Sequence, residues 1–167
     1  MTGSDDSVSL GDVDGAGSGY LQRNLAGQAR LVALGARLSR GDLPTHLSGD
    51  WTAAAVFAHL AFWDHFVLAR WDLYGRTGVI EDLPDSHLDL VNAAGLPLWL
   101  ALDSRAAVLE ATRASSDVCT RIAGLSREAV DTATRSGRLP MLERGLHWSP
   151  HLDELESAAA SAYPAAS

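Results

Sequence analysis

Apolar residues recur at helical spacing along most of this chain, and no stretch alternates apolar and polar residues for long enough to predict a strand. The region from 20 to 38 shows the pattern well, because its leucines are separated by polar residues at intervals of about three to four positions. Such spacing places the apolar side chains on one face of a helix. The sequence therefore predicts an all-α protein. The leucines concerned are Leu21, Leu25, Leu31, Leu34 and Leu38.

Glycine and proline clusters divide the predicted helical regions into four main helices. We expect these helices at 20–38, from 51 or 52 to Tyr74 with a stop at Gly75, at 87–124 with a break around Gly95-Leu96-Pro97, and from Pro140 to about Leu155. Asp50 or Thr52 is the expected N-cap of the second helix. The stretch 126–138 is predicted to be a short, polar, partly helical connection.

Helices of this number and length predict an antiparallel four-helix bundle over residues 20–160. The flanking segments differ in composition. Residues 1–19 are rich in Gly, Ser and Asp and lack an apolar period, so they are predicted to form a disordered N-terminal tail. Residues 161–167 are predicted to form a flexible C-terminal tail. At 167 residues, the chain is long enough for one domain with a proper core.

Charge and composition argue against several classes of function. The formal net charge of −8 disfavours nucleic acid or an anionic membrane as a partner, because both require a basic face. Lysine is absent, which excludes Schiff-base chemistry and a phosphate-loop lysine. No apolar run reaches the roughly 18 residues of a membrane span. Asp5 and Asp6 stand where a signal peptide would carry basic residues, so the expected location is cytoplasmic.

The single cysteine, Cys119, excludes an intrachain disulfide and fits a reducing compartment. Cys119 could in principle be a nucleophile. It lies within a predicted helix, however, in the sequence Val118-Cys119-Thr120-Arg121. We therefore expect a buried and unreactive thiol.

Three histidines form the most informative chemical pattern. His147 and His151 are four residues apart, which places both imidazoles on one helix face, one turn from each other. His59 lies among apolar residues on a different predicted helix. If all three converge, they supply three metal ligands and leave a coordination position for water or substrate, as in catalytic sites. The alternative is that His59 is a core histidine satisfied by one hydrogen bond.

The other histidines and one proline refine this hypothesis. His46, His65 and His87 lack such neighbours and are predicted to be surface or loop residues; His65 lies about 240° around the helix from His59. Pro150 falls between the paired histidines, where it removes a backbone donor and kinks the helix. Ser149-Pro150 could even be the N-cap and first residue of a new helix. Either arrangement would weaken the convergence of the rings.

Carboxylates and tryptophans near the histidines are further candidates. Glu143 and Glu154 lie about one turn from the histidine pair and could accept hydrogen bonds from the ligating imidazoles, although helical glutamates are usually solvated. Three tryptophans could line an apolar pocket beside the metal, although tryptophans on packed helices are more often core residues. They are Trp63, Trp99 and Trp148.

Two segments resemble a known family. The segment from Trp51 to Asp64 resembles the second helix of the DinB-like superfamily, and His147-x-x-x-His151-Leu152-Asp153-Glu154 resembles its last metal-binding helix. The resemblance covers roughly residues 20–156. It implies a four-helix bundle that holds a divalent metal ion, often zinc or nickel, through His59, His147 and His151. It also implies a homodimer, as in many members.

Characterised members of the superfamily include thiol-dependent transferases and isomerases that use mycothiol, bacillithiol or glutathione, among them relatives of the maleylpyruvate isomerase N-terminal domain. Others are self-protection hydrolases that act on reactive natural products. The leading hypothesis is therefore a metal-dependent enzyme that transfers a mycothiol-type thiol to an electrophilic small molecule. The first alternative is a metal-dependent hydrolase, isomerase or cyclase of a reactive natural product. The second is a non-catalytic helical binding module without the metal site.

Overall fold

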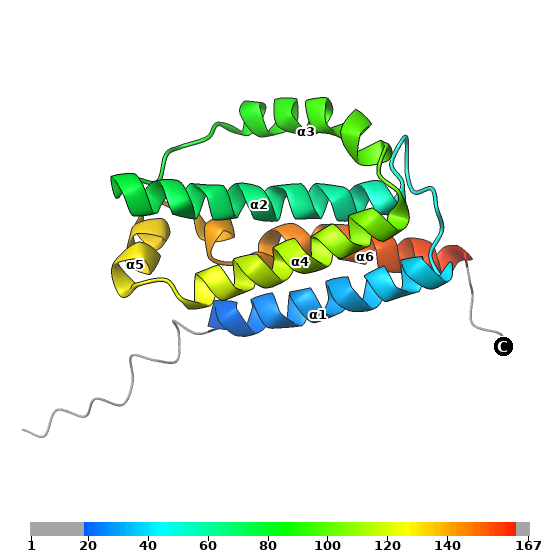
Figure 1. The fold of residues 1–167 in the computed structure, drawn as a ribbon, viewed down its shortest axis with the longest axis horizontal. Coiled ribbons are helices and arrows are strands. Elements are labelled where there is room, and N and C mark those ends of the chain that lie inside the picture. Colours follow the sequence, from blue (N-terminus) through cyan, green and yellow to red (C-terminus); the bar gives the residue numbers. More distant parts are fainter. Residues whose placement is uncertain (1–18, 163–167) are drawn as a thin grey trace, which may run out of the picture.

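The computed structural model describes residues 19–162, and these residues form helices joined by turns and loops, with no strand (Figure 1). The prediction of an all-α protein is confirmed. An isolated backbone bridge between His46 and Thr52 closes the first long loop. The elements are α1 (Gly19–Arg40), α2 (Ala53–Thr77), α3 (Asp85–Leu100), α4 (Ser104–Ala123), α5 (Arg127–Arg135), the 3₁₀ turn η1 (Leu139–Met141) and α6 (Gly145–Ala162).

Four long helices surround the core. α4 packs against both α1 and α2, α6 packs along α1, and α3 lies over α2 on the outside of this group (Figure 1). Phe57, Val118, Trp148 and Leu155 are among the side chains buried completely between these helices. Each large apolar side chain buried in this way contributes roughly 1.5–3 kcal/mol.

α2 is the most deeply buried helix, and its two ends are defined by local chemistry. The Thr52 hydroxyl accepts a hydrogen bond from the backbone N–H of Ala55, as expected for an N-cap. The predicted stop at Gly75 is wrong, because the helix continues to Thr77. It ends where Gly78 adopts a left-handed conformation, with φ of 69°, and donates its N–H to the Tyr74 carbonyl.

The predicted break around Gly95-Leu96-Pro97 is also wrong, because α3 continues through Pro97 to Leu100. Gly95 makes room for the Trp99 ring, since a Cβ atom at this position would clash with that ring. The chain turns at 101–103 instead. Asp103 then accepts a hydrogen bond from the N–H of Ala106, 2.9 Å away, and so caps α4.

The last helix begins at Gly145, and the expected start at Pro140 is wrong, because Pro140 belongs to η1. The start is fixed by a residue of α1. The Asn24 side-chain oxygen accepts hydrogen bonds from the N–H groups of Arg144 (2.7 Å) and Gly145 (3.4 Å). Pro150 does not begin a new helix. A proline removes a single backbone hydrogen bond, and α6 continues past it to Ala162.

The tails predicted at 1–19 and 161–167 lie outside the described residues, except that Gly19 begins α1 and Ser161 and Ala162 end α6. Within the described part of the chain, every helix is too short or too polar to cross a membrane. Cys119 is buried in α4, and this burial raises the pKa of its thiol to about 11. The expectation of a buried thiol is confirmed, and the raised pKa is in keeping with low reactivity.

Candidate metal centre

The structure brings together the three histidines that the sequence singles out. His59 comes from α2, and His147 and His151 come from α6. The His59 ring centroid lies 5.1 Å from that of His147 and 4.7 Å from that of His151, and the two α6 rings are 5.2 Å apart. One nitrogen from each ring lies within 4.8 Å of the other two, so the three could hold a metal ion. Hereafter these residues are called the histidine cluster.

The nitrogens would have to move closer together to bind zinc. A Zn–N distance of about 2.0–2.1 Å places the nitrogens of a tetrahedral site about 3.3 Å apart. In the structure the three nitrogens lie within 4.8 Å of one another. The convergence survives Pro150, because His147 and His151 lie on one continuous helix.

Three nitrogen atoms of the histidine cluster are buried and have no hydrogen-bond partner in the protein: Nδ1 and Nε2 of His59, and Nε2 of His147. Buried polar atoms are normally paired, so an unpaired group requires an explanation. The alternative in which His59 is a core histidine satisfied by one hydrogen bond does not hold, because neither ring nitrogen has such a bond. A metal ion would take up one nitrogen of His59 and Nε2 of His147, and the second His59 nitrogen would still lack a partner in the protein.

Burial keeps the histidine cluster uncharged. Burial, followed by the nearby His151 and Arg144, lowers the pKa of His59 to about 3. Burial followed by the positive charge of Arg144 lowers the pKa of His147 to about 2, and burial lowers that of His151. At neutral pH all three imidazoles are neutral, and a metal ion requires this form because it binds the nitrogen lone pair.

Aromatic rings enclose the His59 imidazole. The Trp99 ring centroid is 4.9 Å from that of His59, and those of Trp51 and Trp63 are 5.5 and 6.3 Å away. Trp63 lines the adjoining cavity, and its Nε1 donates to Asn92 of α3 at 3.0 Å. Trp51 lines the same cavity but was missed by the sequence analysis. It precedes the N-cap of α2, so helical periodicity gives no information on its direction.

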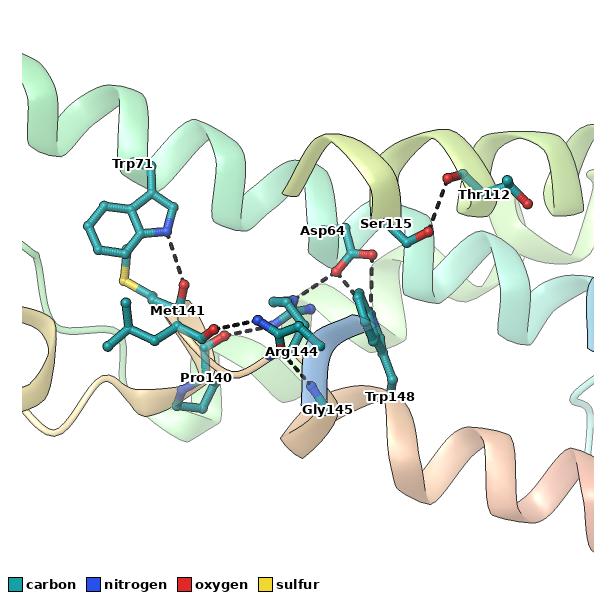
Figure 2. Close-up of polar contacts among 11 residues, drawn as sticks. Asp64, Trp71, Thr112, Ser115, Pro140, Met141, Arg144, Gly145 and Trp148 are labelled. Carbon is teal, nitrogen blue, oxygen red and sulfur yellow. Dashed lines mark hydrogen bonds and ion pairs between the residues drawn. The ribbon is translucent and has the colours of Figure 1, made fainter. Parts of the chain in front are cut away.

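Trp148 is a core residue and does not line the cavity, so its predicted role as a pocket wall is wrong. Its indole Nε1 donates to the two carboxylate oxygens of Asp64, at 3.1 and 3.2 Å (Figure 2). Arg144 Nε donates to the same carboxylate at 2.8 Å, and its Nη1 donates to the Pro140 carbonyl at 3.0 Å. Asp64, Arg144 and Trp148 are called the Asp64 cluster below.

The two candidate carboxylates have partners other than the histidines. Both oxygens of Glu143 accept hydrogen bonds from the Arg23 guanidinium. A Glu154 oxygen accepts a hydrogen bond from the Ser48 hydroxyl at 3.0 Å. Glu154 does lie close enough to His151 for its negative charge to oppose the lowering of the pKa of His151.

A cavity of about 550 Å³ adjoins the histidine cluster, a volume typical of small-molecule sites. One stripe of α2 runs along it, formed by His59, Trp63, Phe66, Val67 and Arg70. His147 and His151 line it from α6. The cluster therefore has unpaired nitrogens, three neutral rings and space beside them for a small molecule.

The remaining histidines are exposed, as predicted. His46 lies in the loop before α2, and His87 lies in the first turn of α3. His65 lies on the exposed face of α2, where its Nε2 is 2.7 Å from a Glu110 oxygen.

No protein-family model, curated protein or solved structure matches this chain. The resemblance to the DinB-like superfamily therefore stays a prediction from the two sequence motifs.

Proposed function

We propose that His59, His147 and His151 bind a divalent metal ion, zinc or nickel, within a DinB-like four-helix bundle formed by α1, α2, α4 and α6. The observation that carries this proposal is the set of buried imidazole nitrogens without protein partners. Three neutral imidazoles suit either metal. A site with three protein ligands keeps a coordination position for water or substrate, which is the arrangement of catalytic metal sites.

The reaction proposed is transfer of a low-molecular-weight thiol of the mycothiol type to an electrophilic small molecule. When bound, a divalent ion lowers the pKa of a coordinated thiol or water and makes it nucleophilic at neutral pH. The protein supplies no good nucleophile of its own, because lysine is absent and Cys119 is buried with a raised pKa. An external thiol therefore fits, and Trp51 and Trp63 give the cavity beside the rings an apolar wall.

The metal-binding part of the proposal is tested by elemental analysis of protein purified without chelators. About one equivalent of zinc or nickel is expected in the wild type, and His59→Ala and His151→Ala should each lose it. His87→Ala is the matched control, because His87 is exposed and distant in sequence from the other three. Substoichiometric metal in the wild type would instead favour a non-catalytic binding module.

The reaction is tested by supplying mycothiol and a generic aryl halide electrophile to the metal-loaded protein. Conjugate formation above the uncatalysed rate, lost in His59→Ala and kept in His87→Ala, supports thiol transfer. Addition of water alone would support the hydrolase instead. The homodimer implied by the resemblance is tested in the same preparations by light scattering.

A further inference from the structure

The cavity beside the histidine cluster is lined by three arginines. They are Arg70 of α2, Arg138 from the turn before η1, and Arg144, and the exposed Asp85 lines the cavity with them. Arg144 and Arg138 are ion-paired with Asp64 and Asp82, so these arginines offer N–H donors to the cavity and no excess of positive charge.

Arg144 provides a second, independent observation. It is buried, with 2% of its surface exposed, and its Nη2 has no hydrogen-bond partner. The other guanidinium nitrogens are used, because Nε donates to Asp64 and Nη1 to the Pro140 carbonyl. A buried guanidinium N–H without an acceptor is costly, and an oxygen atom of a ligand in the cavity would satisfy it.

Arg70 and Arg138 have donors to spare. Arg70 Nη2 donates to the Glu81 backbone carbonyl at 2.6 Å, and Arg138 forms an ion pair with Asp82. A guanidinium carries five N–H donors, so each side chain can also bind an oxyanion. The two guanidiniums are close enough for Arg138 to lower the pKa of Arg70, in addition to the larger effect of burial. A shared anion would offset their repulsion.

The distance along α2 indicates the shape of a ligand. His59 and Arg70 are eleven residues apart, which corresponds to about 16 Å along a helix axis. Between them, the cavity stripe consists of the apolar side chains Trp63, Phe66 and Val67. The cavity therefore has histidines at one end, an apolar middle and arginines at the other end.

We propose that Arg70 and Arg138 bind the oxyanion head group, a carboxylate or a phosphate, of an elongated apolar substrate whose other end reaches the histidine cluster, and that Arg144 Nη2 donates to this substrate. The assignment of the reactive end rests on the proposed function. The oxyanion subsite itself requires no metal.

The test is calorimetric titration of the full chain, without added metal, with octanoate, octyl phosphate and octanol. The three probes share an eight-carbon chain, and octanol lacks the charge. We expect octanoate or octyl phosphate to bind at least tenfold more tightly than octanol, and the preferred anion identifies the head group. In the Arg70→Gln/Arg138→Gln double variant, this preference should disappear while octanol binding stays the same. Arg113→Gln/Arg127→Gln, a change of equal charge at two exposed positions on α4 and α5, should have no effect.

Arg138 also forms an ion pair with Asp82 and could therefore act by fixing the loop that contains Asp82. A separate variant distinguishes this structural role from anion binding. Asp82→Asn breaks this ion pair and leaves the guanidinium in place. Octanoate should bind this variant as tightly as the wild type or more tightly. Equal weakening in Asp82→Asn and Arg138→Gln would overturn the proposal, as would octanoate binding no tighter than octanol. The Arg70→Gln/Arg138→Gln variant keeps all three histidines and should retain its metal in elemental analysis, so failure of the metal site and failure of the oxyanion subsite give different results.

Discussion

The histidine cluster and the Asp64 cluster lie next to each other in the sequence, yet their polar atoms are satisfied in different ways. Asp64 follows His59 by five residues on α2, Trp148 follows His147 on α6, and Arg144 lies in the turn just before α6. The Asp64 carboxylate accepts hydrogen bonds from both partners and carries the charge opposite to that of Arg144 (Figure 2). The histidine cluster has no such complement, and its buried nitrogens have no partner.

The difference separates a structural cluster from a binding cluster. A carboxylate and a guanidinium satisfy each other, and such a network holds two helices in one arrangement. Three neutral imidazoles carry no opposite charges that attract one another, and they do not satisfy one another's hydrogen-bonding atoms. Protein atoms pair the charges of the first cluster and leave only Arg144 Nη2 without an acceptor, whereas the buried nitrogens of the second cluster depend on a ligand. Four predictions test this contrast.

The largest effect is expected from Asp64→Ala, which leaves the buried Arg144 without a counter-charge. Breaking a buried ion pair in this way costs about 3–5 kcal/mol of unfolding free energy. Urea denaturation monitored by circular dichroism measures it. Asp72→Ala is the control, since its pair with Arg121 is exposed and such pairs contribute about 0–1 kcal/mol. Similar losses of unfolding free energy in both variants would show that the Asp64 cluster does not hold the helices together.

We expect added metal to stabilise the folded protein by binding at the histidine cluster and not at the Asp64 cluster. Zinc or nickel at about one hundred times its dissociation constant should raise the unfolding free energy by about 2.7 kcal/mol. His59→Ala should abolish this gain, while Asp72→Ala should keep it. The same urea experiment, run with chelator and with added metal, gives both values. Equal stabilisation of His59→Ala and the wild type would place the metal elsewhere.

Acid should destabilise the metal-free protein through the same histidines. The folded-state pKa values of His59 and His147 are about 3 and about 2, below the ordinary value of 6.5, so the unfolded chain binds protons first as pH falls. The stability that these two histidines contribute by staying neutral is fully present above pH 6.5, and it is lost as the pH falls from 6.5 towards 3. Each histidine accounts for at most about 1.4 kcal/mol per pH unit. A His59→Ala/His147→Ala variant should show a flatter pH profile between pH 6 and 4.

The smallest effect is expected from Glu143→Gln. Because both Glu143 oxygens are occupied by Arg23, the substitution should change the metal dissociation constant by less than about twofold. Loss of a carboxylate that supports a ligating histidine typically costs 10–100-fold. Competition with a chromogenic chelator resolves the two outcomes. A tenfold loss would assign Glu143 to the histidine cluster after all.

Helical periodicity was sufficient to predict the all-α class, because it depends only on which residues are apolar. It also placed His147 and His151 on one face, since four residues make about one turn. The boundaries were less predictable. The start of α6 depends on Asn24, which is 120 residues from Arg144, and propensity along the chain carries no information on such a contact. Gly95 accommodates the ring of Trp99, one turn later on the same helix, instead of ending that helix, and this effect depends on side-chain packing and not on backbone propensity.

The sequence by itself determined the helices, the three candidate ligands and the lack of a lysine or a reactive cysteine. Only the tertiary structure decided that His59 meets the α6 pair, that Trp148 belongs to the core, and that Arg70 and Arg138 share a cavity with the histidines. The physical reason is that periodicity fixes the direction of a side chain around its own helix. Whether side chains from two helices come into contact depends on how those helices pack, and the packing is determined by all the side chains of the core together.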